Sequence, residues 1–72
     1  MTNEKRYNVY IIAIHGGEAE AIIGENMTAE RAERRVMTGL QRIDRDNYFV
    51  ADLEVGSDID LKHAESLKNN KN

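Results

Sequence analysis

The chain has 72 residues, of which 13 are acidic and 10 are lysine or arginine, so its formal net charge is −3, and it has no cysteine. A chain of this length forms one domain and buries only about 60% of the surface that it exposes when unfolded. The absence of cysteine excludes disulfides and thiolate metal sites, and the acidic total argues against nucleic-acid binding by the whole surface.

Two runs rich in β-branched residues flank Gly16-Gly17 and predict a β-hairpin. Both glycines tolerate the positive φ of a tight two-residue turn. With His15 opposite Glu18, one side of the hairpin is uniformly apolar, whereas the other side is mixed. Because a buried face specifies the register of a strand, we expect the uniform side to face the core: Tyr10, Ile12, Ile14, Ala19, Ala21 and Ile23.

The segment TAERAERRVMTGLQRIDR, residues 28–45, predicts a helix with Thr28 as its N-cap. At about 100° per residue, its apolar residues form one stripe: Ala29, Ala32, Val36, Leu40 and Ile43. Gly39 lies at the edge of this stripe. Because glycine within a helix costs about 1 kcal/mol relative to alanine, we expect the backbone to approach the sheet closely there. The alternative is that the helix ends at Gly39.

The stretch NYFVADLEVGSD alternates apolar and polar residues and predicts a half-buried strand. The pair Ser57 and Asp60 resembles a capping box that opens a short helix, with Leu61, Ala64 and Leu67 at intervals of three. Since the first strand is apolar on both sides, we place it at the centre of the sheet. The sequence therefore predicts a two-layer α+β fold, β-β-α-β-α, in which the main helix covers one face of an antiparallel sheet of order 2-1-3.

The sequence also predicts the extent and location of the protein. We expect a single domain over residues 1–68 and a disordered tail at 69–72. No run approaches the roughly 20 apolar residues that span a bilayer, and no small-residue cleavage site follows the first apolar run. These features predict a cytoplasmic protein with no membrane contact.

Five of the six arginines lie in segment 28–45, and the helical wheel places them together, opposite the apolar stripe: Arg31, Arg34, Arg35, Arg42 and Arg45. With three acids, the segment nets +2, which leaves −5 for the rest of the chain. One interpretation is a solvated helix face with a Glu30–Arg34 pair. The other is a binding surface, because the planar guanidinium group suits carboxylates and phosphates.

The partner of this arginine face is expected to be a host or phage protein. The alternative is nucleic acid, bound through its phosphates. Base stacking requires exposed aromatic side chains near the basic surface, and the helical segment has none. No helix-turn-helix, zinc-finger or RNP-like pattern is present either.

The second face of the sheet offers an apolar association face with an acidic rim: Val9, Ile11, Ile22, Tyr48 and Val50. Exposed apolar patches mark association sites, here for a homodimer that stacks its sheets or for a partner protein. The alternative is that the C-terminal helix folds back over this face with Leu61 and Leu67.

No arrangement of residues indicates catalysis or metal binding. His15 and His63 are the only histidines, and Asp58, Asp60 and His63 lack the remaining ligands of a calcium loop. The serines have no base and orienting acid at plausible positions, and no phosphate-binding loop is present. We therefore expect no enzyme activity, cofactor or metal site.

The stretches YNVYIIAI, EAIIGENMTAERAERRV and NYFVADLEV, within residues 7–56, resemble small uncharacterised ββαβ proteins of bacterial prophages and plasmids. The resemblance implies a mobile-element origin and an accessory role, and it transfers no functional residues. Together these observations predict a small non-enzymatic protein-interaction module.

Overall fold

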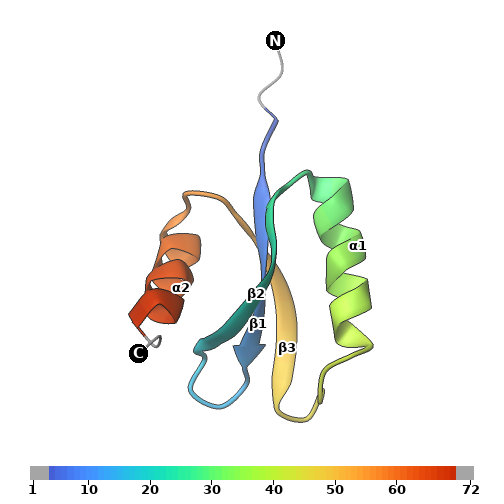
Figure 1. Cartoon of the computed structure of the whole chain (residues 1–72), viewed down its shortest axis with the longest axis vertical. Coiled ribbons are helices and arrows are strands. Elements are labelled where there is room, and N and C mark those ends of the chain that lie inside the picture. Colours follow the sequence, from blue (N-terminus) through green and yellow to red (C-terminus); the bar gives the residue numbers. More distant parts are fainter. Residues whose placement is uncertain (1–3, 70–72) are drawn as a thin grey trace.

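The computed structural model of the chain describes residues 4–69. It has strands β1 (Tyr7–Ala13), β2 (Ala19–Met27) and β3 (Tyr48–Glu54), and helices α1 (Ala29–Leu40) and α2 (Asp58–Asn69). The strands form an antiparallel sheet in the order β2-β1-β3 (Figure 1). The predicted α+β class, element order and sheet order are therefore confirmed.

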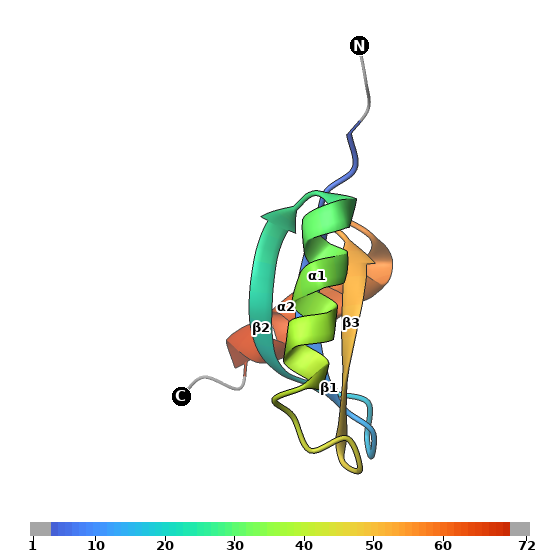
Figure 2. The same ribbon diagram turned by 90° about the vertical axis from the view of Figure 1, so that its right-hand side faces the viewer.

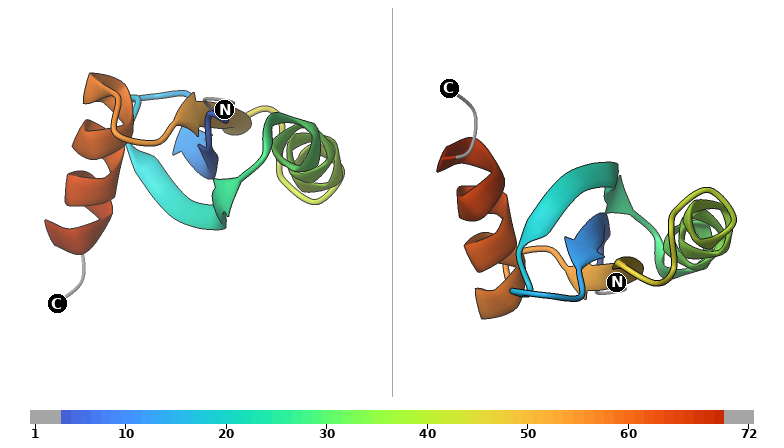
Figure 3. Two further views of the ribbon diagram at one scale, coloured as in Figure 1. Left: turned by 90° about the horizontal axis from the view of Figure 1, so that it is seen from above. Right: turned by 90° about the horizontal axis from the view of Figure 1, so that it is seen from below.

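The two helices lie on opposite sides of the sheet (Figures 1 and 3). The main helix α1 packs on a core that contains Val9 and Val50, whereas α2 packs through Leu67 on a core that contains Tyr10 and Ile12. The C-terminal helix folds back over the sheet and adds a layer to the two that were expected, but it covers the face of Tyr10 and not the face of Val9 that the alternative assigned to it. Leu67 packs there, whereas Leu61 is 55% exposed.

The main helix covers the face of β1 that was predicted to be free of it. Both faces of β1 are apolar, so apolarity alone does not decide which one α1 covers. Strands β2 and β3 both run antiparallel to β1, so β2, α1 and β3 form a crossover connection between parallel strands. This crossover is right-handed (Figure 2), as nearly all such connections are. Its hand places α1 over Val9 and Ile11.

The hairpin that joins β1 and β2 has a longer loop than predicted. Gly16 and Gly17 both have positive φ, 93° and 69°, as the sequence indicated. However, the amide of Ala13 donates to the Glu18 carbonyl at 2.8 Å, and the amide of Gly17 donates to the Ala13 carbonyl at 3.1 Å. The loop therefore occupies residues 14–18, and Ile14, predicted to be in the core, is 46% exposed.

The pairing of β1 with β2 also differs from the prediction, because it contains register shifts. Tyr10 pairs with Ile22 rather than Ile23, and Ile12 pairs with Ala19 rather than Ala21. Ile23 consequently faces α1 and Ile22 faces the core of Tyr10, the reverse of the prediction, whereas Ala19 lies beside Tyr10 as predicted. The pairing of β1 with β3, in contrast, runs without interruption from Tyr7–Glu54 to Ala13–Tyr48.

The predicted association face is not one exposed surface. Val9 is fully buried beneath α1 with Val50, and Ile11 is half-buried beside them. Ile22 packs on the opposite face, against the core of Tyr10, and Tyr48 is half-buried. Because a helix covers each face of the sheet, a homodimer that stacks its sheets lacks the surface that it was expected to use.

Helix α1 begins as predicted but ends early. The side chain of Thr28 accepts a hydrogen bond from the Arg31 amide, as expected of an N-cap residue. The predicted segment 28–45 carries its apolar stripe to Ile43, whereas α1 ends at Leu40, one residue beyond the end at Gly39 that was the alternative. In the last turn the Arg42 amide donates to the carbonyl three residues before it, a tightening that is common where helices end.

Gly39 brings α1 close to the sheet, which confirms the prediction. It is buried, and a Cβ atom there would lie 2.9 Å from the Ile23 side chain and 3.2 Å from that of Val50. Both approaches are tighter than ordinary van der Waals contact, so any larger residue here would displace the end of the Ile23 side chain and push against Val50.

At the C-terminus, α2 includes Asn69, the first residue of the predicted tail. Residues 70–72 lie outside the described residues.

We predict that Gly39→Val lowers the free energy of unfolding by about 2 kcal/mol, because the new methyl groups overpack the interface between α1 and the sheet. Urea unfolding followed by circular dichroism measures this change. Thr38→Val is the control, since Thr38 is exposed on the same turn and should change stability by less than about 0.5 kcal/mol. Equal stability of the two variants would contradict the close approach at Gly39.

Candidate functional site

Two adjoining hollows follow the side of α1 that faces β2. The first, of about 420 Å³, is lined by Met27, Arg31, Arg34, Arg35 and Thr38. The second, of about 220 Å³, is lined by Ile11, Ile23, Arg35, Thr38, Gly39, Arg42 and Ile43. Arg35 and Thr38 line both hollows, which therefore adjoin each other, and we call the two together the arginine groove.

The helical repeat explains why these side chains line one groove. Arg31, Arg35 and Thr38 follow one another at intervals of four and three residues, so they lie on the same side of α1. The neighbouring stripe, which includes the buried Ala32, packs on the sheet. The groove therefore lies where the polar side of the helix meets the edge of β2.

The arginines differ in how firmly the protein holds them. The Nη1 atom of Arg35 donates to the Ile23 carbonyl at 2.9 Å, which fixes Arg35 against β2. Arg34 pairs with Glu30 at 3.4 Å, but both side chains are more than 75% exposed, and such pairs contribute little. Within residues 4–69, neither Arg31 nor Arg42 has a carboxylate within 4.0 Å.

The structure brings together four of the five predicted arginines. Arg31, Arg34 and Arg35 lie on α1, and Arg42 lines the groove from the loop after it. Arg45 does not line the groove, because its Nε atom donates to the Leu40 carbonyl at 3.0 Å. The prediction that all five lie on one helical face is therefore wrong for Arg42 and Arg45, which follow the end of the helix.

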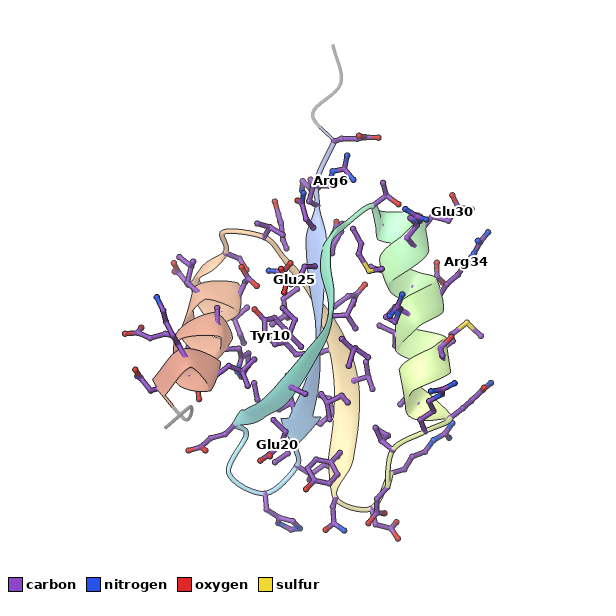
Figure 4. All side chains as sticks on the ribbon, viewed as in Figure 1. Arg6, Tyr10, Glu20, Glu25, Glu30 and Arg34 are labelled. Atoms are coloured by element: carbon purple, nitrogen blue, oxygen red, sulfur yellow. The ribbon has the colours of Figure 1, made fainter. Side chains whose placement is uncertain are left out.

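A larger hollow, of about 670 Å³, lies on the other side of β2, between this strand and α2. It is lined by Asn8, Tyr10, Glu20, Ile22, Glu25, Ala64, Leu67 and Lys68. Figure 4 shows Tyr10, Glu20 and Glu25 on the α2 side, and Glu30 and Arg34 on the α1 side. Strand β2 thus separates a basic groove from a hollow that contains two carboxylates.

A buried polar cluster lies beside this larger hollow. The Tyr10 hydroxyl donates to Oδ1 of Asp60 at 2.8 Å, and the Asn8 side-chain amide donates to the same oxygen at 2.8 Å. The Gly56 amide donates to the other carboxylate oxygen at 3.0 Å. Tyr10 is fully buried and Asp60 is 3% exposed. We call these residues, with His63, the Asp60 cluster.

The cluster shifts the pKa values of its two acids in opposite directions. Burial, followed by the hydrogen bond to Asp60 and the charge of that carboxylate, raises the pKa of Tyr10 to about 12. Burial also opposes ionisation of Asp60, but hydrogen bonds from Gly56, Asn8 and Tyr10 outweigh it and lower the pKa of Asp60. The cluster therefore consists of a neutral phenol and an ionised carboxylate over a wide pH range.

The contacts within the cluster are structural. Among the described residues, no buried side-chain nitrogen or oxygen lacks a hydrogen-bond partner, so the cluster has no unsatisfied group directed at a ligand. The His63 ring packs on the Tyr10 ring, with centroids 5.7 Å apart. We conclude that the cluster holds α2 on the sheet.

Sequence reasoning found only part of this cluster. The capping box predicted at Ser57 and Asp60 is half formed, because the Asp60 amide donates to the Ser57 hydroxyl at 3.3 Å, but the Asp60 carboxylate binds Gly56 and the sheet instead. The sequence does show that Asp60 and His63 lie on one side of a predicted helix, and that Asn8 and Tyr10 lie on one side of a predicted strand. Neither spacing indicates that the two pairs meet across 50 residues of chain.

No protein-family model, curated protein or solved structure significantly matches the chain. Over residues 4–69, no three metal-binding side chains come together in a group that could hold an ion. None of the helices in that range has the length and apolar character needed to cross a membrane.

We predict that one tyrosine ionises only near pH 12, because Tyr10 must lose a buried hydrogen bond to a carboxylate when it ionises. The ultraviolet absorbance of tyrosinate, followed against pH, measures this step. Since the folded pKa of Tyr10 exceeds the unfolded value of 10.0, its contribution to stability is complete below pH 10 and is lost as the pH rises toward 12.

Two variants check that prediction. Tyr10→Phe should remove the late ionisation and lower the free energy of unfolding by about 2 kcal/mol, as expected for a hydrogen bond to a charged group. Asp60→Asn should move the late step to lower pH, because it removes the carboxylate charge. A late step that persists in Tyr10→Phe would show that another tyrosine is responsible.

Proposed function

We propose that this protein is a non-enzymatic interaction module that binds an acidic surface of a partner protein through the arginine groove. One observation carries the proposal. Arg31 and Arg42 stand at the two ends of the groove and, within the described residues, have no carboxylate within 4.0 Å. Positive charge is therefore concentrated on one side of a chain whose net charge is −3.

The composition of the surface supports a protein partner. Arginine and methionine are enriched at protein interfaces, and the wider hollow of the groove is lined by three arginines and by Met27. The groove also has an apolar floor, to which Ile11, Ile23 and Ile43 contribute. A surface of this kind provides both charge for orientation and apolar area for burial.

Nucleic acid is the second candidate, because guanidinium groups bind phosphates as readily as carboxylates. The residues that line the groove include no aromatic side chain, so the surface provides no platform for stacked bases. That the protein serves a phage or plasmid as an accessory factor, and that its partner is a host or phage protein, stay predictions from the sequence.

We predict that Arg34→Glu combined with Arg42→Glu abolishes capture of the partner by immobilised protein from bacterial lysate, because two cations of the groove become anions. Both residues are exposed, so the circular dichroism spectrum should not change. Arg6→Glu with Lys62→Glu is the matched control, since it makes the same change in net charge outside the groove. Equal capture by both double variants would exclude the groove as the contact surface.

We also predict that affinity for mixed duplex DNA is weak at low salt and has no steep salt dependence. Each phosphate contact would contribute about −0.9 to the slope of log affinity against log salt concentration, so a fluorescence titration at several salt concentrations measures the number of contacts. A slope of about −3 or steeper, reduced in the variant with Arg34→Glu and Arg42→Glu, would favour nucleic acid as the partner.

A further inference from the structure

The two hollows of the arginine groove differ in chemistry. The wider one, which contains Arg31 and Arg34, is mainly polar and charged. The narrower one, which contains Ile23 and Ile43, has an apolar floor and is bounded at its far end by Arg42. Its volume of about 220 Å³ is below the range of roughly 300 Å³ and more that is typical of small-molecule sites, and it suits a single side chain.

Cations flank this apolar hollow on both sides. Arg35 stands at the boundary with the wider hollow, held by its hydrogen bond to the Ile23 carbonyl, and Arg42 stands opposite. A ligand whose apolar group enters the hollow therefore meets a guanidinium group in either direction along the groove. Carboxylates on both sides of an apolar group match this arrangement.

The length of the groove indicates an extended peptide. From Arg31 to the end of α1 at Leu40 the helix rises by about 14 Å, at 1.5 Å per residue. An extended chain rises by about 3.3 Å per residue, so about four residues cover this distance. Successive side chains of an extended peptide point to opposite sides, so the residues two positions before and after an apolar residue point the same way as it does. Acidic residues at those two positions can therefore reach the arginines on either side of the hollow.

We propose that the arginine groove binds a short extended segment of a partner protein in which one large apolar residue lies between acidic residues. The apolar side chain enters the hollow of Ile11, Ile23 and Ile43, and the carboxylates bind Arg35 and Arg42. This inference rests on the proposed function and specifies the chemistry of the partner.

A peptide pair tests the proposal with the full chain. The probe is the fluorescein-labelled peptide Gly-Asp-Glu-Leu-Glu-Asp-Gly, and its control replaces leucine with serine at unchanged charge. Fluorescence anisotropy, with protein concentrations up to about 1 mM to detect weak binding, should show the leucine peptide binding about tenfold or more tightly than the serine peptide, as expected for burial of one apolar side chain.

Variants place the peptide in the groove. Arg42→Glu should weaken binding of the leucine peptide about tenfold or more, whereas Arg6→Glu, which makes the same charge change elsewhere, should not. In the amide correlation spectrum of the isotope-labelled protein, the peptide should shift the signals of Thr38 and Gly39 and leave those of α2 unchanged. Together these results would support the proposal.

Other outcomes overturn it in distinguishable ways. Equal binding of the two peptides would show that the groove binds acidic peptides through their charge alone and does not recognise the apolar side chain. That result overturns this inference and leaves the proposed function standing. Binding of neither peptide, or shifts confined to α2, would overturn the groove as a peptide site, while lysate capture tests the function separately. Displacement of the peptide by duplex DNA would assign the groove to nucleic acid instead.

Discussion

The architecture depends on the burial of both faces of the central strand β1. Val9, directed toward α1, and Tyr10, directed toward α2, are each fully buried, so both helices are required to cover this one strand. A chain of 72 residues buries only a small apolar core. Here the buried apolar residues are divided into two small cores, one on each side of the sheet. The right-handed crossover from β2 through α1 to β3 then determines which core lies beneath the main helix.

The two cores are stabilised by different means. Beneath α1 the contacts are apolar, and Gly39 lets the helix approach Val50 closely. Beneath α2 a hydrogen-bonded carboxylate, Asp60, takes the place of an apolar side chain, and the phenol of Tyr10 satisfies it. A buried charge must be paired or hydrogen-bonded, so the second helix has one well-specified position on the sheet, although its apolar residues Ile59 and Leu61 are more than half exposed.

Strand β2 connects this architecture to the surface that we propose as functional. It is an edge strand, and its neighbours are the arginine groove on one side and the hollow with Glu20 and Glu25 on the other. Arg35 donates to the Ile23 carbonyl of this strand, so the strand itself holds one arginine of the groove in place.

The sequence by itself determined the element order, the sheet order, the positive φ at Gly16 and Gly17, the Thr28 cap and the close approach at Gly39, because each follows from local periodicity or from the conformational limits of one residue. It also placed Arg31, Arg34 and Arg35 together on the polar side of the helix, since their spacing is a local property. Only the tertiary structure decided which face of β1 the main helix covers, because both faces are apolar and the hand of the crossover makes the choice. It likewise decided the pairing of Asp60 with Tyr10, which joins residues that no local pattern relates.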